Sequence, residues 1–238
     1  MTQTPPSASH EPRPALSGSA VPQGRTRPVK VWDLPTRIFH WSFAALVLLA
    51  FATSEGGDTI LSIHVFLGTV LVGFVVYRVI WGVIGSRHAL FTDFVYGPAT
   101  VMDYAKRLIA FRPPYSVGHN PLGGWMVLAL LGVVLVASLT GMMVVEDGYV
   151  GPLSNFAGGI FGHLHEGLGT FVMVLVGVHV AGVFAHLILS RENLIRAMLT
   201  GLKHAPSDEP VESIRPVGFV RPMIALAIAL AVVLYFLR

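Results

Sequence analysis

Long apolar stretches constrain the fold of this chain more than any other feature. Five stand out, at about residues 38–53, 60–84, 122–145, 160–189 and 222–237. A helix that crosses a bilayer needs about 20 apolar residues, so the middle three are long enough and the first and last are short. We expect the first to begin near Leu34, with Arg37 reaching back to the membrane surface. The sequence therefore predicts an all-α integral membrane protein with a four-helix bundle and a fifth, C-terminal transmembrane helix.

Composition agrees with a chain built in lipid. Charged residues make up 12% of the 238 residues, against about 25% in an ordinary soluble domain. Residues 1–29 are rich in Pro, Ser, Thr and Arg and lack an apolar core, which predicts a disordered tail and not a secretory signal. The predicted parts are this cytoplasmic tail at 1–29, a four-helix domain at 30–200, a cytoplasmic connector at 201–221 and the last helix at 222–238.

The distribution of basic residues predicts the orientation of the spans. Lys and Arg are absent from the loops 54–59 and 146–159, which carry Glu55, Asp58, Glu146 and Asp147. By the positive-inside rule, the N-terminus is cytoplasmic and these acidic loops face outward. Basic residues gather instead before the first span, between spans two and three, and after span four: Arg13, Arg25, Arg27, Lys30, Arg37; Arg87, Lys106, Arg107, Arg112; Arg191, Arg196, Lys203, Arg215, Arg221.

Two classes of function are excluded by charge and cysteine content. The sequence pI is about 9.4, but the basic excess lies in cytoplasmic flanks that meet anionic membrane lipid, so no nucleic-acid partner is expected. The chain has no Cys, which excludes covalent c-type haem, Cys-ligated iron–sulfur clusters and internal disulfides. Any metal centre in this chain must therefore use other ligands.

Histidines in and beside the spans are the strongest functional signal, because ionisable groups inside lipid are costly. Four of the ten, His10, His88, His119 and His204, fall in hydrophilic segments and are expected to be solvated. His40 and His179 fall at the inner level of the predicted spans, and His64 and His165 at the outer level. His165 and His179 are fourteen residues apart, about 21 Å along one helix face.

Two histidine pairs at two depths suit two haems, because a bis-His haem needs two helices that present neutral imidazoles to opposite faces of the ring. We pair His40 with His179 and His64 with His165. Nearby glycines could make room for a macrocycle or serve ordinary helix packing, and these are Gly68, Gly169, Gly177 and Gly182. A metal or proton transporter is the competing interpretation, but spans one to four lack the additional acidic groups that such a pathway uses.

Arg78 lies fourteen residues beyond His64, at the inner level. It could pair with the propionates of the inner haem, or extend its head group to the cytoplasmic surface. Arg37 has the same two interpretations. His163 is expected at the outer interface, while His186 could contact a quinone, relay a proton or support the inner propionates.

Four motifs surround these histidines. They are VWDLPTRIFHW at 31–41, Ile63-His64 followed by YRVIW at 77–81, Leu164-His165-Glu166, and LVGVH at 175–179. Together, in order over residues 31–198, they resemble the bacterial cytochrome b561 family and the closely related b-type cytochrome subunits of membrane-bound nickel–iron hydrogenases.

The resemblance implies a four-helix bundle in the bacterial inner membrane that holds two non-covalent b haems. The axial ligands carried over are His40, His64, His165 and His179. Electrons would pass between a partner at one face, such as a partner subunit or a c-type cytochrome outside, and a quinone or second partner at the other.

The chain departs from the family's simplest members in two ways. The added helix over 222–237 could dock against a partner subunit, and the outer loops lack the basic residues that would attract superoxide. The alternative function is a stand-alone quinone-linked oxidoreductase, such as a superoxide oxidase or ferric reductase. A structural anchor without haems is disfavoured by the four histidines.

Overall fold

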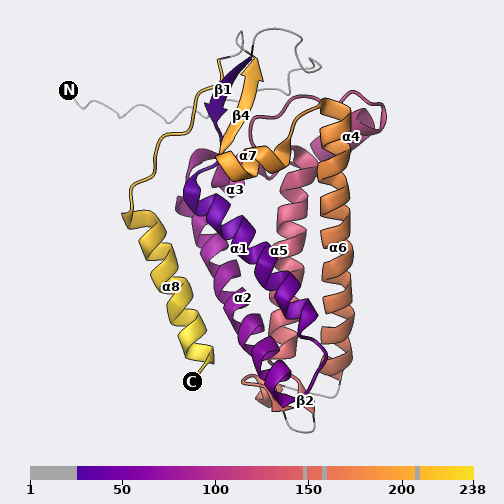
Figure 1. The fold of residues 1–238 in the computed structure, drawn as a ribbon, viewed down its shortest axis with the longest axis vertical. Helices are drawn as coiled ribbons and strands as arrows, with labels where there is room; N and C mark the ends of the chain where they lie inside the picture. The colour runs from indigo at the N-terminus through magenta and orange to yellow at the C-terminus, as the bar shows by residue number, and fades with distance from the viewer. Residues whose placement is uncertain (1–25, 147–148, 157–159, 207–209) are drawn as a thin grey trace, which may run out of the picture.

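The computed structural model describes residues 26–146, 149–156, 160–206 and 210–238. Four long helices in this part of the chain are apolar enough to cross a membrane, as predicted (Figure 1). They are α1 (Leu34–Ala52), α2 (Asp58–Ile84), α5 (Pro121–Gly141) and α6 (Ile160–Ser190). The fold is therefore the predicted all-α membrane bundle.

Helix α1 begins at Leu34, where the sequence predicted. Asp33 precedes it as the N-cap, with its carboxylate accepting from the backbone N–H of Thr36. The same carboxylate accepts from the hydroxyl of Ser86, beyond the end of α2, and the indole N–H of Trp81 donates to the hydroxyl of Thr36 at 3.1 Å. Because all these groups are buried, the capping contacts also fix the start of α1 against the end of α2.

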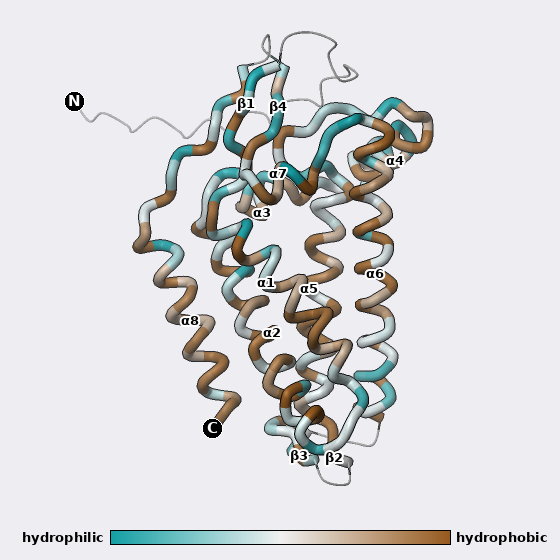
Figure 2. Tube along the Cα trace, viewed as in Figure 1, coloured by the Kyte–Doolittle hydropathy of each residue, from teal (hydrophilic) through white to brown (hydrophobic). Residues whose placement is uncertain are grey.

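The four spans pack as a bundle with its apolar core at their centre. Helix α5 lies against α6, and α2 lies against both α1 and α5. Figure 2 shows hydrophobic residues concentrated along the spans, with hydrophilic segments gathered mainly at the two ends. The buried core is Phe39, Val47, Ala50, Leu67, Leu71, Val75, Leu131, Val134 and Val172.

A compact cap covers the end of the bundle that the charge pattern assigns to the cytoplasm. Strand β1 (Thr26–Lys30) pairs antiparallel with β4 (Leu202–Pro206), and α7 (Leu194–Thr200) lies beneath them (Figure 1). Residues 26–29 were expected in the disordered tail and instead belong to β1; residues 1–25 lie outside the described ranges. The remaining cap elements are η1 (Arg87–Ala89), α3 (Phe91–Phe94) and α4 (Pro98–Ile109).

At the opposite end the described chain forms only short elements. They are β2 (Val145–Glu146), β3 (Tyr149–Val150) and η2 (Ser154–Phe156). Asp147, expected in the acidic outer loop, lies outside the described residues, whereas Glu55 and Asp58 are exposed.

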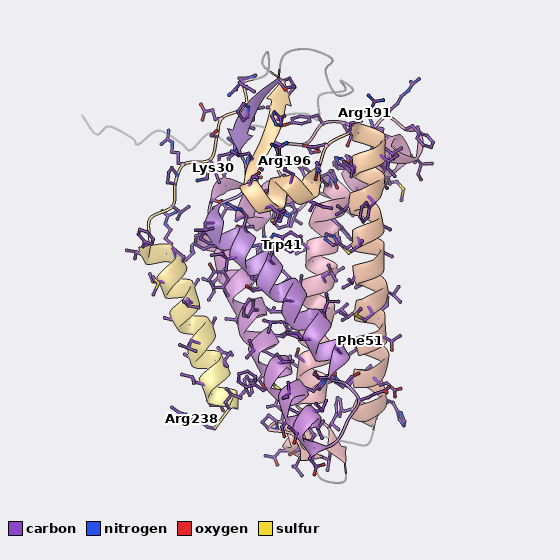
Figure 3. The ribbon with its side chains drawn as sticks, viewed as in Figure 1. Lys30, Trp41, Phe51, Arg191, Arg196 and Arg238 are labelled. Carbon is purple, nitrogen blue, oxygen red and sulfur yellow. The ribbon has the colours of Figure 1, made fainter. Side chains whose placement is uncertain are left out.

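Helix α8 (Val220–Phe236) packs along α2. The buried residues of α8 are the small Ala225 and Ala229. The two helices approach so closely that a Cβ on Gly73 of α2 would lie 2.3 Å from the Val233 side chain. One face of α8 is thus covered by this chain's own α2. In Figure 3, Lys30, Arg191 and Arg196 lie at the cap end, while Arg238 lies toward the other end. With 17 residues, about 26 Å of helix, α8 is shorter than the four candidate spans.

Candidate functional site

The structure brings His64 of α2 and His165 of α6 together near the end of the bundle away from the cap. Their Nε2 atoms lie 3.5 Å apart, and the ring planes are nearly perpendicular, at 79°. Their Nδ1 atoms each lie 2.8 Å from a backbone carbonyl oxygen, that of Ala50 for His64 and that of Ala137 for His165. The two rings are therefore held from behind and point at each other.

This arrangement assigns the protons of the two rings. A carbonyl oxygen only accepts, so Nδ1 carries the proton in each ring and the facing Nε2 atoms are both acceptors. Two facing lone pairs favour an acceptor of both, such as a metal ion. Since metal–imidazole bonds are about 2 Å long, an ion between two imidazoles needs nitrogens about 4 Å apart. The observed separation fits this need to within about half an ångström.

A glycine makes the approach of His165 possible. A Cβ on Gly141 of α5 would lie 2.8 Å from Cε1 of the His165 ring. Any larger residue would displace the ring from its carbonyl and from His64. By contrast, a Cβ on Gly68, Gly169, Gly177 or Gly182 would meet no atom within 4 Å, so these four glycines leave space beside the histidines.

The second predicted pair, His40 of α1 and His179 of α6, also comes together. The ring centroids lie 6.2 Å apart, with the planes tilted by 55°. Unlike the first pair, His40 has a buried Nδ1 without a hydrogen-bond partner in the described structure. We call His64 with His165 the outer pair and His40 with His179 the inner pair, following the predicted orientation.

The two arginines of the predicted site lie in different surroundings. Arg78 is buried, with its guanidinium carbon 5.1 Å from the ring centre of Phe91 and 5.5 Å from that of Phe94. Arg37 instead donates from Nε to the carbonyl of Met198 at 3.3 Å and from Nη2 to that of Leu199, near the C-terminal end of α7. These contacts give Arg37 a structural part as a helix cap; its predicted contact with a propionate stays a prediction.

The two other histidines of α6 separate as well. His163 is exposed, in accord with an interfacial position. His186 is buried, and its Nε2 lies 3.0 Å from Glu192, whose other oxygen lies 2.9 Å from Nζ of Lys203. Lys203 also donates to the carbonyl of Ser116 at 2.8 Å. We call His186, Glu192 and Lys203 the cap triad; it ties the end of α6 to β4 and to the loop before α5.

Charge and burial oppose each other in the cap triad. Burial by itself would raise the pKa of Glu192, but the hydrogen bond with His186 and the charge of Lys203 hold that pKa below its ordinary value. Burial lowers the pKa of Lys203, and Glu192 offsets part of this effect. Glu192 and Lys203 therefore form a buried ion pair in which each charge stabilises the other, and His186 adds a hydrogen bond to Glu192.

The prediction that His88 and His119 are solvated is wrong, because ring atoms of both are buried. His88 is buried and its Nδ1 lies 2.8 Å from a carboxylate oxygen of Asp93. The ring of His119 lies between Trp32, which it meets edge to face at a centroid distance of 4.6 Å, and the tilted ring of Phe94 at 4.5 Å, and its Nδ1 is buried. Both lie in segments without helical periodicity, so only the flanking glycine and proline residues, which predict turns, marked these segments in the sequence.

The arrangement of the outer pair fits a bis-His haem. The chain offers two neutral imidazoles on different helices, each oriented by a carbonyl that would strengthen its basicity as a ligand. The open positions beside the glycines would admit a flat ring. No such carbonyl anchors are found for the inner pair in the described structure, although its rings lie at a comparable separation.

Comparisons with known proteins identify the family and several relatives of this chain. The family model described as prokaryotic cytochrome b561 matches residues 31–201. A probable Ni/Fe-hydrogenase B-type cytochrome subunit of Rhizobium leguminosarum bv. viciae is 26% identical, over 73% of this chain and 87% of the relative. Proteins of the same name from Bradyrhizobium diazoefficiens and Azotobacter vinelandii are 25% and 26% identical, over 73% and 76% of this chain and 85% and 91% of their own lengths. No solved structure matches the chain.

Proposed function

The chain belongs to the prokaryotic cytochrome b561 family, and we propose that it binds two b haems and passes electrons between them across the bacterial inner membrane. It is a multi-pass membrane b-type cytochrome of electron transport. In our proposal, His64 and His165 ligate the outer haem, and His40 and His179 the inner one. The observation that carries the proposal is the outer pair, whose Nε2 atoms face each other at 3.5 Å.

The protein's own part in the chemistry is orientation and exclusion. The carbonyls of Ala50 and Ala137 hold the proton on Nδ1 and so keep each Nε2 free to donate to a metal. If His64 and His165, or His40 and His179, together held one haem iron, no position would remain for oxygen or another small ligand, which would favour electron transfer over bond-making chemistry. When bound, haem b supplies a reversible one-electron change at iron.

We propose that the redox partner is a nickel–iron hydrogenase, because relatives at 25–26% identity over most of their lengths carry that name. Electrons would leave or enter at the opposite face through a quinone or a second partner. In this orientation the N-terminus and the cap are cytoplasmic and the outer pair lies near the periplasm. The exposed Glu55 and Asp58 would then attract a cationic carrier and repel an anion such as superoxide.

Haem content of the purified full chain tests the first part. A pyridine haemochrome assay should give two b haems per chain with a low-spin bis-His spectrum. Replacing His64 by Ala should remove the outer haem only, and His179→Ala the inner one only, while His163→Ala, at an exposed histidine of the same helix, should keep both. One haem per chain, or none, contradicts the proposal.

The partner is tested by the source of electrons. In membranes that contain both proteins, hydrogen should reduce the haems, and the chain should copurify with the hydrogenase. Reduction by superoxide near the diffusion limit, without any response to hydrogen, would support the stand-alone oxidoreductase instead.

A further inference from the structure

Buried nitrogens without partners lie close to the inner pair. In the described chain these include Nδ1 of His40, Nη1 of Arg78 and Nδ1 of His119. His119 interacts electrostatically with both Arg78 and His40, which places the three side chains in one region. Buried polar groups are almost always satisfied, so such a cluster calls for a ligand that accepts hydrogen bonds.

Two aromatic rings lie against the guanidinium of Arg78. Its guanidinium lies against Phe91 and Phe94, and these rings are held close because Gly82 and Gly124 have no side chains. A Cβ on Gly82 would lie 2.2 Å from the Phe91 ring, and one on Gly124 would lie 2.4 Å from the carbonyl oxygen of Phe94. The exposed fraction of Arg78 is 3%, and its Nη1 has no hydrogen-bond partner within the described structure.

His119 shares the Phe94 ring with Arg78. Its ring centre lies 4.5 Å from that of Phe94, and Trp32 closes the other side at 4.6 Å. Burial, together with the nearby charge of Arg78, lowers the pKa of His119 to about 3. The imidazole is therefore neutral and offers one N–H donor beside a fixed positive charge.

The nearest carboxylates of the cap are already committed. Asp33 accepts from the backbone of Thr36 and from Ser86, at the start of α1. Asp93 accepts from His88 and also faces Arg87 at 3.8 Å. Neither satisfies the free nitrogens of Arg78 and His119, so the anion that does so must come from outside the described chain.

We propose that Arg78 and His119 together bind the propionate carboxylates of the inner haem. This inference rests on the proposed function, because it requires a haem at the inner pair. Arg78 supplies a charge-assisted hydrogen bond in a site closed to water, and His119 supplies a neutral donor from the loop before α5. The inner haem is thus held by its edge as well as by its iron.

Haem whose propionates are methylated provides the test, because the esters keep the iron and the ring but remove both negative charges. The purified full chain is depleted of haem with apomyoglobin and reloaded with haem b or its dimethyl ester. The inner site should prefer haem b by about tenfold or more, as expected for loss of a charge-assisted bond. The outer site of the same molecule is the internal control for ester solubility.

Variants then assign the preference to the two residues. Arg78→Gln and His119→Leu should each reduce the preference for haem b at the inner site several-fold, and the double variant should abolish it. Arg87→Gln and His204→Leu, which change an exposed arginine and an exposed histidine of the same cap, should leave it unchanged. The readout is the ratio of two affinities, so a general loss of stability does not imitate it.

Three outcomes would overturn the inference. Equal affinity of the wild-type inner site for haem b and its ester would show that the propionates make no strong contact, and this result needs no variant. An unchanged preference in the double variant would place the propionates elsewhere. Absence of any haem at the wild-type inner site would overturn the proposed two-haem function together with this inference, and the missing haem distinguishes that case.

Discussion

The two histidine pairs are held in different ways. In the outer pair, each Nδ1 lies 2.8 Å from a backbone carbonyl and the Nε2 atoms face each other. In the inner pair, Nδ1 of His40 is buried and has no hydrogen-bond partner in the described structure. Backbone carbonyls therefore hold both rings of the outer pair, whereas His40 lacks such a contact.

The source of the anchors differs between the two pairs. Ala50 and Ala137 lie near the C-terminal ends of α1 and α5, at the end of the bundle away from the cap, and their carbonyls also accept from the hydroxyls of Thr53 and Thr140. Nδ1 of His40 has no such anchor in the described structure, and His119 of the cap interacts electrostatically with His40. The outer pair is therefore anchored by backbone remote from the cap, whereas the inner pair lies next to the cap. The outer site should tolerate changes in the cap that the inner site does not.

A change in the cap triad should produce the largest difference between the inner and outer pairs. Glu192→Gln leaves Lys203 buried without its counter-charge, which should cost about 3 kcal/mol in the free energy of unfolding. Lys203 also holds the loop that carries His119, so the inner haem should be lost on heating before the outer one. Spectra recorded during thermal unfolding check this order. The double variant with Lys203→Met should recover most of the stability.

Acidification should also remove the charge of Glu192, as the Glu192→Gln substitution does. The pKa of Glu192 in the folded protein is held below the value of about 4.3 that is ordinary for an unfolded chain. The stability that the Glu192 carboxylate contributes is therefore fully present above the ordinary pKa. It is lost as the pH falls through the lower pKa of the folded protein. The Glu192→Gln variant should lack this part of the acid response. An equal response in both chains would contradict the assigned role of the ion pair.

Gly141→Ala should produce a smaller effect, confined to the outer pair. The new Cβ would lie 2.8 Å from Cε1 of His165 and would push the ring away from its carbonyl and from His64. Overpacking of this kind costs about 1–3 kcal/mol, so outer haem affinity should fall by roughly tenfold or more. Haem titration measures it. Gly132→Ala on the same helix, where a Cβ meets nothing within 4 Å, is the matched control.

Gly73→Ala should have the smallest effect and should spare both pairs. Its Cβ would lie 2.3 Å from the end of the Val233 side chain and would push α8 from α2, at a cost of about 1 kcal/mol. The two haems per chain should remain, since α8 contributes no histidine. Crosslinking between cysteines introduced on α2 and α8 would report the displacement. Loss of either haem would mean that α8 supports the bundle more strongly than its contacts suggest.

Much of the architecture could be predicted because its signals are local. The spans follow from apolar length, and α1 begins at Leu34 because Asp33 caps it and Pro35 can occupy the first turn. The meeting of His64 with His165 and of His40 with His179 follows from the fixed rise of a helix, which converts position in the sequence into depth. The roles of these four histidines as haem ligands stay predictions.

Contacts between distant segments were decided only by the tertiary structure. Phe94 ends α3 and His119 lies in the loop before α5, and their burial with Arg78 has no counterpart in hydrophobic periodicity. Likewise, Glu192 contacts Lys203 because β4, which carries Lys203, pairs antiparallel with β1. Arg37 donates to the carbonyl of Met198 near the end of α7, 161 residues away in the sequence. The amino-acid sequence alone determined which segments are apolar enough to cross a membrane and at which level along the bundle the four paired histidines lie, because apolar length and helical rise depend on each segment by itself. Which polar groups surround the inner pair depended on how the cap closes over the bundle, because each of those contacts joins side chains that no local pattern relates.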